Sequence, residues 1–294
     1  MINFYEVCNY YDIEINRVKI DKSFVFIYSN DKIYLIKKKC NKDIYSYFDS
    51  INFNGYINNI GYYNEYELCC FYEDKCIESY GKAKELILTL SDLHNKSHSY
   101  IDFDTSRKED IYNVYKNKIN ECMNYYLKLQ DSIEEMEFIL PQYYLLLINI
   151  SKFYKLLHFA SSKLDEFYNI DSIHIRDVML VGNLSLDNYC CGEKKYFIDY
   201  SLSKRDYLVY DLVSFYRNNY LNLDCKSLID YYDSLIHLND EERNLFLLII
   251  SIPNIIEFNH SNFDNTFLVR NEINYVLKTM RFVLEENKEN QKAN

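Results

Sequence analysis

The feature that most constrains the fold is a change in the spacing of hydrophobic residues, from strand-like to mostly helical, after about residue 75. Before it, three runs have strand-like patterns: I-E-I-N-R-V-K-I (13–20), S-F-V-F-I-Y-S (23–29) and K-I-Y-L-I-K-K-K (32–39). The second and third runs flank Ser29-Asn30-Asp31, a sequence typical of a hairpin turn. The N-terminal region is therefore predicted to form a small antiparallel sheet.

The pattern becomes mostly helical further along the chain. Residues 42–51 have helical spacing, and a strand-like run at 67–73 follows a loop that contains Gly55 and Gly61. Long helical patterns then occupy 83–169 and 207–286, with short strands around a loop between them at 173–200 and a break near Pro253. A small β-rich region followed by a mostly helical one predicts an α+β fold.

Composition narrows the class of protein. The 294 residues are 48% hydrophobic, which suffices for a sizeable core, and the net charge of −11 disfavours a nucleic-acid partner. No segment reaches the roughly 18 uninterrupted apolar residues of a membrane helix, so no membrane association is expected. The N-terminus lacks the pattern of a secretory signal, and a cytoplasmic location is expected.

The nine cysteines and six histidines do not form a recognisable metal motif. No C-x-x-C occurs. Cys69-Cys70 and Cys190-Cys191 are adjacent in the sequence, and adjacent residues seldom bind one ion. His94 and His98 have the i, i+4 spacing that can bind zinc, but H-N-K-S-H lacks the Glu of H-E-x-x-H. A pair at a helix end that faces solvent is the expectation for them.

The most informative tract is V-G-N-L-S-L-D-N (181–188), followed by F-I-D-Y (197–200). Kinase loops of the pattern H-x-D-L-x-x-x-N supply an Asp for the attacking hydroxyl and an Asn for the metal, and a later Asp binds metal again. Asn183 and Asn188 have the spacing of that Asp and Asn, and Asp199 follows. Singly, each could be a polar turn or a strand-end carboxylate; together they favour a kinase-like fold.

The tract resembles the aminoglycoside phosphotransferase and choline kinase group, whose loop reads H-G-D-L-x-x-x-N with I-D-W or I-D-F downstream. Gly182 matches, and S-K-R-D-Y-L-V-Y-D-L-V-S-F-Y (203–216) looks like the helix that follows in that group, with Asp211 at its characteristic Asp. The spore-coat and choline/ethanolamine kinase branches are the most similar. The resemblance is specific over 173–217 and architectural elsewhere.

The resemblance implies a two-lobed protein kinase-like fold. Residues 1–75 would form the nucleotide-binding β-rich lobe, and 76–294 a helical lobe with the catalytic-like loop at 181–199. ATP and magnesium are the implied cofactors, and a small hydroxylated molecule is the implied acceptor.

Site residues follow from the same resemblance. Asn188 and Asp199 would bind magnesium, and Lys37 would reach the phosphates of ATP, although Lys38 and Lys39 adjoin it. The carboxylate that pairs with this lysine should lie within 42–54, where Asp43 and Asp49 are available. Asp49 is preferred because it sits better inside the helix. No Gly-rich loop lies between the first strands.

Two departures from the pattern concern the chemistry. Asn183 stands where the group has its catalytic Asp, and an amide cannot accept a proton at neutral pH. Val181 replaces a His that braces the loop, a role that apolar packing could take over. Asp187 is the nearby carboxylate on the loop.

Three hypotheses remain open. The chain binds ATP and magnesium with weak or lost transfer, as a pseudokinase does; or it is an active small-molecule kinase with a weak or relocated base, such as Asp187; or it is a non-catalytic helical scaffold. A protein partner that completes the site is compatible with each of them.

Overall fold

The structure, a computed structural model, describes residues 3–21, 23–30, 32–40, 43–75, 78–102, 105–170, 173–259 and 261–293. The chain divides into two compact units that each combine distant segments. The first comprises Met1–Ser99, Asp177–Asn218 and Ser227–His237, and the second comprises Tyr100–Arg176, Asn219–Lys226 and Leu238–Asn294. This division differs from the expected boundary after residue 75, and the lobe boundary stays a prediction.

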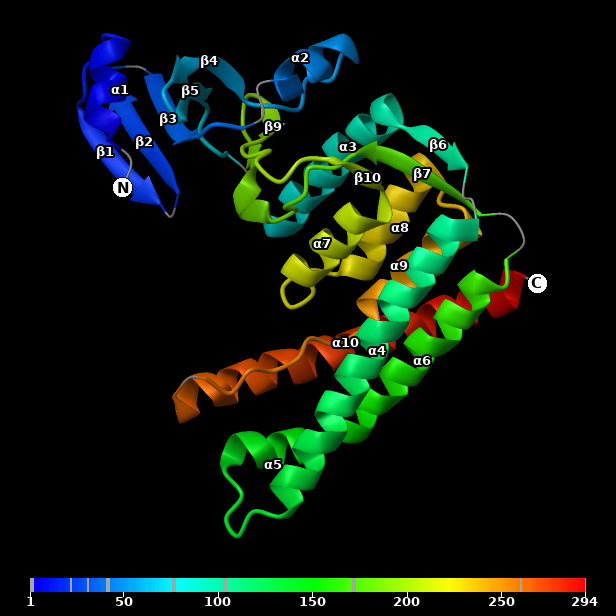
Figure 1. The fold of residues 1–294 in the computed structure, drawn as a ribbon. Helices are drawn as coiled ribbons and strands as arrows, with labels where there is room; N and C mark the ends of the chain where they lie inside the picture. The colour runs from blue at the N-terminus through cyan, green and yellow to red at the C-terminus, as the bar shows by residue number, and fades with distance from the viewer. Residues whose placement is uncertain are drawn as a thin grey trace. The chain divides into compact units, whose positions relative to one another are not determined.

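The first unit is built on a five-stranded antiparallel sheet in the order β1-β2-β3-β5-β4 (Figure 1). Its strands are β1 (Arg17–Asp21), β2 (Phe24–Ser29), β3 (Lys32–Lys38), β4 (Asn58–Tyr63) and β5 (Tyr66–Phe71). The predicted sheet and the hairpin between β2 and β3 are confirmed. Asn30 in that turn has a positive φ of 47°, which Asn tolerates, whereas Asp31 lies outside the described residues.

Two elements of this unit do not stand out in the sequence. Strand β4 reads N-N-I-G-Y-Y, and Asn and Gly disfavour strands, so it was expected to be part of a loop. It is held by pairing with β5, with a register shift between Asn59 and Gly61. Helix α1 (Phe4–Tyr10) is too short to be stable alone, and packing of its Val7 and Cys8 side chains against the sheet stabilises it.

The sheet is covered on both faces, and this arrangement positions the site. On one face α1 packs against Val25, Ile27, Ile36 and Leu68. On the other face Leu35 and Cys69 pack against residues of the β8–β9 hairpin and the segment after it: Cys190, Tyr196 and Ile198. Because successive side chains of a strand alternate between faces, Lys37 and Glu67 lie on this second face.

The other elements of the first unit lie before, within or after the predicted catalytic-like loop at 181–199 in the chain. Helix α2 is Asp43–Ser50, as predicted for 42–51, and α3 is Ser79–Ser97. The other elements, by bounds, are β7 (His174–Met179), the 3₁₀ turn η1 (Leu186–Asn188), β8 (Tyr189–Cys191), β9 (Lys195–Phe197), β10 (Arg205–Tyr207), α7 (Val209–Asn219) and α8 (Cys225–Ile236). Strand β10 pairs antiparallel with β7, so the chain returns to the loop start after passing the hairpin.

The second unit is mainly helical. Its elements are β6 (Ser99–Asp102), α4 (Thr105–Glu134), α5 (Pro141–Leu147), α6 (Ile150–Tyr168), α9 (Asp240–Ile250) and α10 (Asn262–Ala293). Helix α6 packs against α4 and α9, and α5 packs against α10 (Figure 1). Pro141 opens α5, where its missing N–H needs no partner. The predicted α+β class is confirmed.

Two features support α9 and its surroundings. Asn239 and Glu242 form a capping box at its start, and the same Glu242 makes a buried ion pair with Arg176. The helix ends at Ile250, which confirms the predicted break near Pro253. Within the described ranges, none of the helices combines the length and the apolar character that crossing a bilayer requires.

Candidate functional site

Lys37 is buried on the sheet face that carries the β8–β9 hairpin. Its side chain is 1% exposed, and its Nζ donates a hydrogen bond of 2.7 Å to the Ile198 carbonyl. The same Nζ lies 3.8 Å from Asp199 Oδ1. Lys38 is exposed, and the ammonium of Lys39 lies over the Tyr62 ring. Of the three adjacent lysines, it is therefore Lys37 that reaches the predicted metal ligand.

The ion pair of Lys37 corrects an expectation. Its partner is Glu67 of β5, whose Oε1 lies 2.7 Å from Nζ, because the two residues are directly opposed in the β3–β5 pairing. Asp49 is exposed on α2 and accepts a hydrogen bond from Tyr56 instead. The side chain of Asp43 lies outside the described part of the chain. Whether Asp49 touches a cofactor is a separate question, and that role stays a prediction.

Asn188 ties the loop to the segment that carries Asp199. Its Nδ2 donates to the carbonyls of Asn183 at 2.9 Å and Asp199 at 3.1 Å, and its Oδ1 accepts from the Asp199 backbone N–H at 2.8 Å. The side chain is buried at the end of η1. The two residues predicted to bind magnesium are thus hydrogen-bonded neighbours. We refer to Lys37, Glu67, Asn188 and Asp199 as the anchor cluster.

The carboxylate of Asp199 is the accessible part of this cluster, with 24% of the side chain exposed. Its Oδ1 accepts from the Ser201 N–H at 3.0 Å, and its Oδ2 accepts from the Ser201 hydroxyl at 2.7 Å. The Cys40 thiol lies 3.6 Å from both Lys37 Nζ and Asp199 Oδ1. Burial raises the pKa of Cys40 to about 11, so this thiol is neutral near pH 7.

The start of the loop is held from its buried side. The carboxylate of Asp211, on α7, accepts the backbone N–H of Val181 at 2.8 Å and that of Gly182 at 2.9 Å. His94 of α3 bonds the same carboxylate through Nε2 and the Tyr232 hydroxyl through Nδ1. Val181 itself is fully buried, in keeping with the apolar packing expected of it.

Gly182 cannot be exchanged for a larger residue in this loop. Its φ is +86°, a left-handed conformation that disfavours residues with a Cβ. A Cβ at this position would lie 2.5 Å from the backbone oxygen of Leu202, closer than such atoms approach one another. The local backbone therefore explains the Gly of this tract without reference to a ligand.

Asn183 and Asp187 lie at the surface of the same loop. Both are exposed, and Asp187 is part of η1. The residue predicted to stand at the base position is thus an exposed amide, and a carboxylate follows four residues later along the chain. Their catalytic roles stay predictions.

The expectation for the histidine pair is half right. His98 is exposed and contacts the Asn95 carbonyl, but His94 is buried in the network described above. Sequence periodicity could not reveal this, because the burial of His94 depends on packing by α7 and α8. Within the described residues, no group of three or more His, Cys, Asp and Glu side chains is arranged around a common metal position.

Magnesium is nevertheless compatible with the anchor cluster. The ion prefers oxygen ligands and is commonly held by one or two protein groups together with water and substrate phosphates. Asn188 Oδ1 and the exposed Asp199 carboxylate supply such oxygens next to each other. Lys37 adds a positive charge beside them. This donor set fits a magnesium–nucleotide complex.

The structure thus brings Lys37 of β3, Asn188 of the loop and Asp199 after it into one cluster of hydrogen bonds and ion pairs. The chain is similar in structure to an aminoglycoside phosphotransferase from Alicyclobacillus acidocaldarius subsp. acidocaldarius DSM 446, with a TM-score of 0.71 and 10% identity over 94% of this chain and 92% of that one. It is also similar to an AMP-bound spectinomycin phosphotransferase (TM-score 0.59, 14% identity, 94% and 97% covered). A third similar structure is a microcompartment-associated aminopropanol kinase (TM-score 0.55, 9% identity, 95% and 96% covered).

These likenesses extend over almost the whole chain and confirm the two-lobed kinase-like fold of the aminoglycoside phosphotransferase type. No protein-family model matches the sequence, and no curated protein sequence does so either. At identities of 9–14% the likeness concerns the fold.

Proposed function

We propose that this protein binds a magnesium–nucleotide complex at the anchor cluster and transfers phosphate weakly or not at all. The observation that carries the proposal is the juxtaposition of three groups. Lys37 Nζ lies 3.8 Å from Asp199 Oδ1, and the Asp199 N–H donates to Asn188 Oδ1 at 2.8 Å. Spectinomycin phosphotransferase, which has a similar fold, has been solved with ADP and spectinomycin, which supports a nucleotide as the ligand.

The residues of this chain would divide the work of binding. Asn188 and Asp199 would hold magnesium, which neutralises charge on the phosphates when bound. Lys37 would orient the phosphates by its charge. Asn183 could hold an acceptor hydroxyl by hydrogen bonding but could not take its proton at neutral pH. A positioned base contributes about 10²–10⁴-fold to a rate, so transfer should be slow.

An active kinase of small hydroxylated acceptors is the second candidate. The observation that favours it is the exposed carboxylate of Asp187 on the same loop. If Asp187 serves as base, Asp187→Asn lowers phosphotransfer, whereas under the first proposal it has no such effect. A cytoplasmic location stays a prediction for either candidate.

Unfolding in the presence and absence of Mg-ATP or Mg-ADP tests nucleotide binding. A ligand at 100 times its dissociation constant should add roughly 2.7 kcal/mol to the free energy of unfolding. Asp199→Ala should remove this stabilisation, whereas Asp92→Ala, which changes a half-exposed carboxylate of α3 that pairs with Lys96, should keep it. A wild-type protein that no nucleotide stabilises would contradict the proposal and favour the scaffold hypothesis.

A further inference from the structure

The ion pair between Lys37 and Glu67 belongs to the sheet. The two residues are paired across β3 and β5, both side chains are at most 1% exposed, and Nζ and Oε1 are 2.7 Å apart. A charge in such a place is strongly destabilised without its partner. The pairing of β3 with β5 holds the two backbones opposite each other, so a displacement of α2 alone would leave both residues in place.

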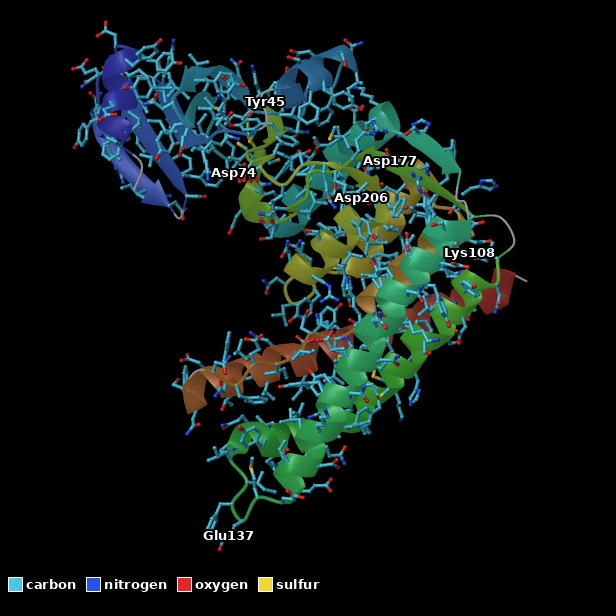
Figure 2. All side chains as sticks on the ribbon, in the orientation of Figure 1. Tyr45, Asp74, Lys108, Glu137, Asp177 and Asp206 are labelled. Carbon is cyan, nitrogen blue, oxygen red and sulfur yellow. The ribbon has the colours of Figure 1, made fainter. Side chains whose placement is uncertain are left out.

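Helix α2 contributes a neutral group to this pair. Tyr45 lies on the side of α2 that faces the sheet (Figure 2), and its hydroxyl donates to Glu67 Oε1 at 2.9 Å. Burial, together with the neighbouring Glu67, raises the pKa of Tyr45 far above its ordinary value, so the phenol stays protonated. Asn59 of β4 donates to the other oxygen, Oε2, at 3.2 Å. Glu67 is thus held by three elements, of which α2 is one.

The other end of Lys37 reaches the loop segment. Nζ donates to the Ile198 carbonyl at 2.7 Å and lies 3.8 Å from Asp199 Oδ1. Burial alone would lower the pKa of Lys37, but Cys40 and Glu67 raise it above its ordinary value. Because Cys40 is a neutral thiol near pH 7, the carboxylate of Glu67 is the main cause there.

In protein kinases the partner of this lysine stands on a helix, and the position of that helix makes or breaks the pair. We propose that Glu67 is the positioning residue for Lys37 in this protein, so that the sheet, and not α2, aligns the lysine with Asp199. The inference deepens the proposed function and rests on it for its effect on nucleotide affinity. It means that displacement of α2 does not switch the site.

Three variants distinguish the contribution of Glu67 on β5 from that of Tyr45 on α2. Glu67→Gln removes the charge, Tyr45→Phe removes the contact from α2, and Glu65→Gln changes an exposed carboxylate beside β5 as the control. Calorimetric titration with Mg-ADP should show affinity weakened at least tenfold by Glu67→Gln, and less than threefold by Tyr45→Phe and Glu65→Gln. Equal losses for Glu67→Gln and Tyr45→Phe, or none for Glu67→Gln, would overturn the proposal.

If the wild type binds no nucleotide, the proposed function fails, and amide exchange of the wild type, which needs no ligand, decides the inference.

Amide exchange of the wild type covers the case in which Glu67→Gln does not fold. The amides of Lys37 and Glu67 should exchange at least tenfold more slowly than those of the eight-residue helix α2. Exchange of all of them at one rate would show that α2 and the pair open together, and would overturn the proposal.

Discussion

The anchor cluster and the exposed loop positions Asn183 and Asp187 are parts of one site with different physical surroundings. Lys37, Glu67 and Asn188 are buried and bonded on several sides, whereas Asn183 and Asp187 are exposed. The residues that match the kinase pattern are those that the fold also uses, since Asn188 ties the loop to Asp199. Substitutions at the anchor cluster are therefore expected to change stability as well as the proposed nucleotide binding, whereas substitutions at Asn183 and Asp187 are expected to change only the proposed chemistry.

The largest effect should come from the anchor cluster. Lys37→Met leaves the carboxylate of Glu67 buried without its cation, which should lower the free energy of unfolding by about 3–5 kcal/mol. Denaturant unfolding measures this. Lys38→Met, on the exposed neighbour, should change it by less than about 0.5 kcal/mol. Similar values for the two variants would mean that burial does not distinguish Lys37.

The next largest loss of stability should come from Asp211, which binds the buried side of the loop at Val181 and Gly182. Asp211→Asn keeps one acceptor oxygen but turns an amide NH₂ toward a backbone N–H, which leaves a buried donor without a partner. The expected loss of unfolding free energy is about 1–3 kcal/mol. Asp92→Asn on the surface of α3 is the matched control. A loss no larger than that of the control would show that the loop does not depend on Asp211.

A substitution at the exposed residue Asn183 should change the rate of phosphotransfer and leave stability nearly unchanged. Asn183→Asp should raise phosphotransfer about 10²-fold because it restores a proton acceptor, with stability changed by less than about 0.5 kcal/mol. A coupled assay of ADP formation measures the rate. An unchanged rate in a folded variant would count against residue 183 as the position of the base.

A smaller effect should appear in the pH dependence of stability. Burial raises the pKa of Cys40 from 9.0 to about 11, so the folded protein holds this proton where the unfolded chain has lost it. Stability from this group is complete below pH 9 and decreases as pH rises toward 11, by roughly 2 kcal/mol. Cys40→Ala should make the decrease between pH 9 and 11 shallower. An identical slope would mean that Cys40 does not contribute to it.

The elements predicted from the sequence are those with strong local patterns. Strands β2 and β3 are runs rich in β-branched and aromatic residues on either side of a turn, and α2 and α3 have helical spacing, so each is apparent from its own residues. Strand β4 and helix α1 are stabilised by their neighbours, and a local pattern does not reveal them.

The same distinction applies to the site. Asn188 and Asp199 were singled out because they match a family pattern, and Lys37 because of its place on the third predicted strand; their binding roles stay predictions. Glu67 was missed because its role depends on the pairing register of two strands, and His94 was missed because its burial depends on helix packing. Ser201, which bonds both oxygens of Asp199, falls outside the family pattern and has no other signal.

The pairing of Lys37 with Glu67 also has a consequence for folding accuracy. If β3 and β5 were misaligned by one residue, Lys37 would stand opposite Tyr66 or Leu68, and the two charges would point to opposite faces of the sheet. One of them would then be packed against the apolar residues beneath α1 without a counter-ion. We therefore expect the ion pair to disfavour misregistered sheets while the chain folds, whether or not a nucleotide ever binds.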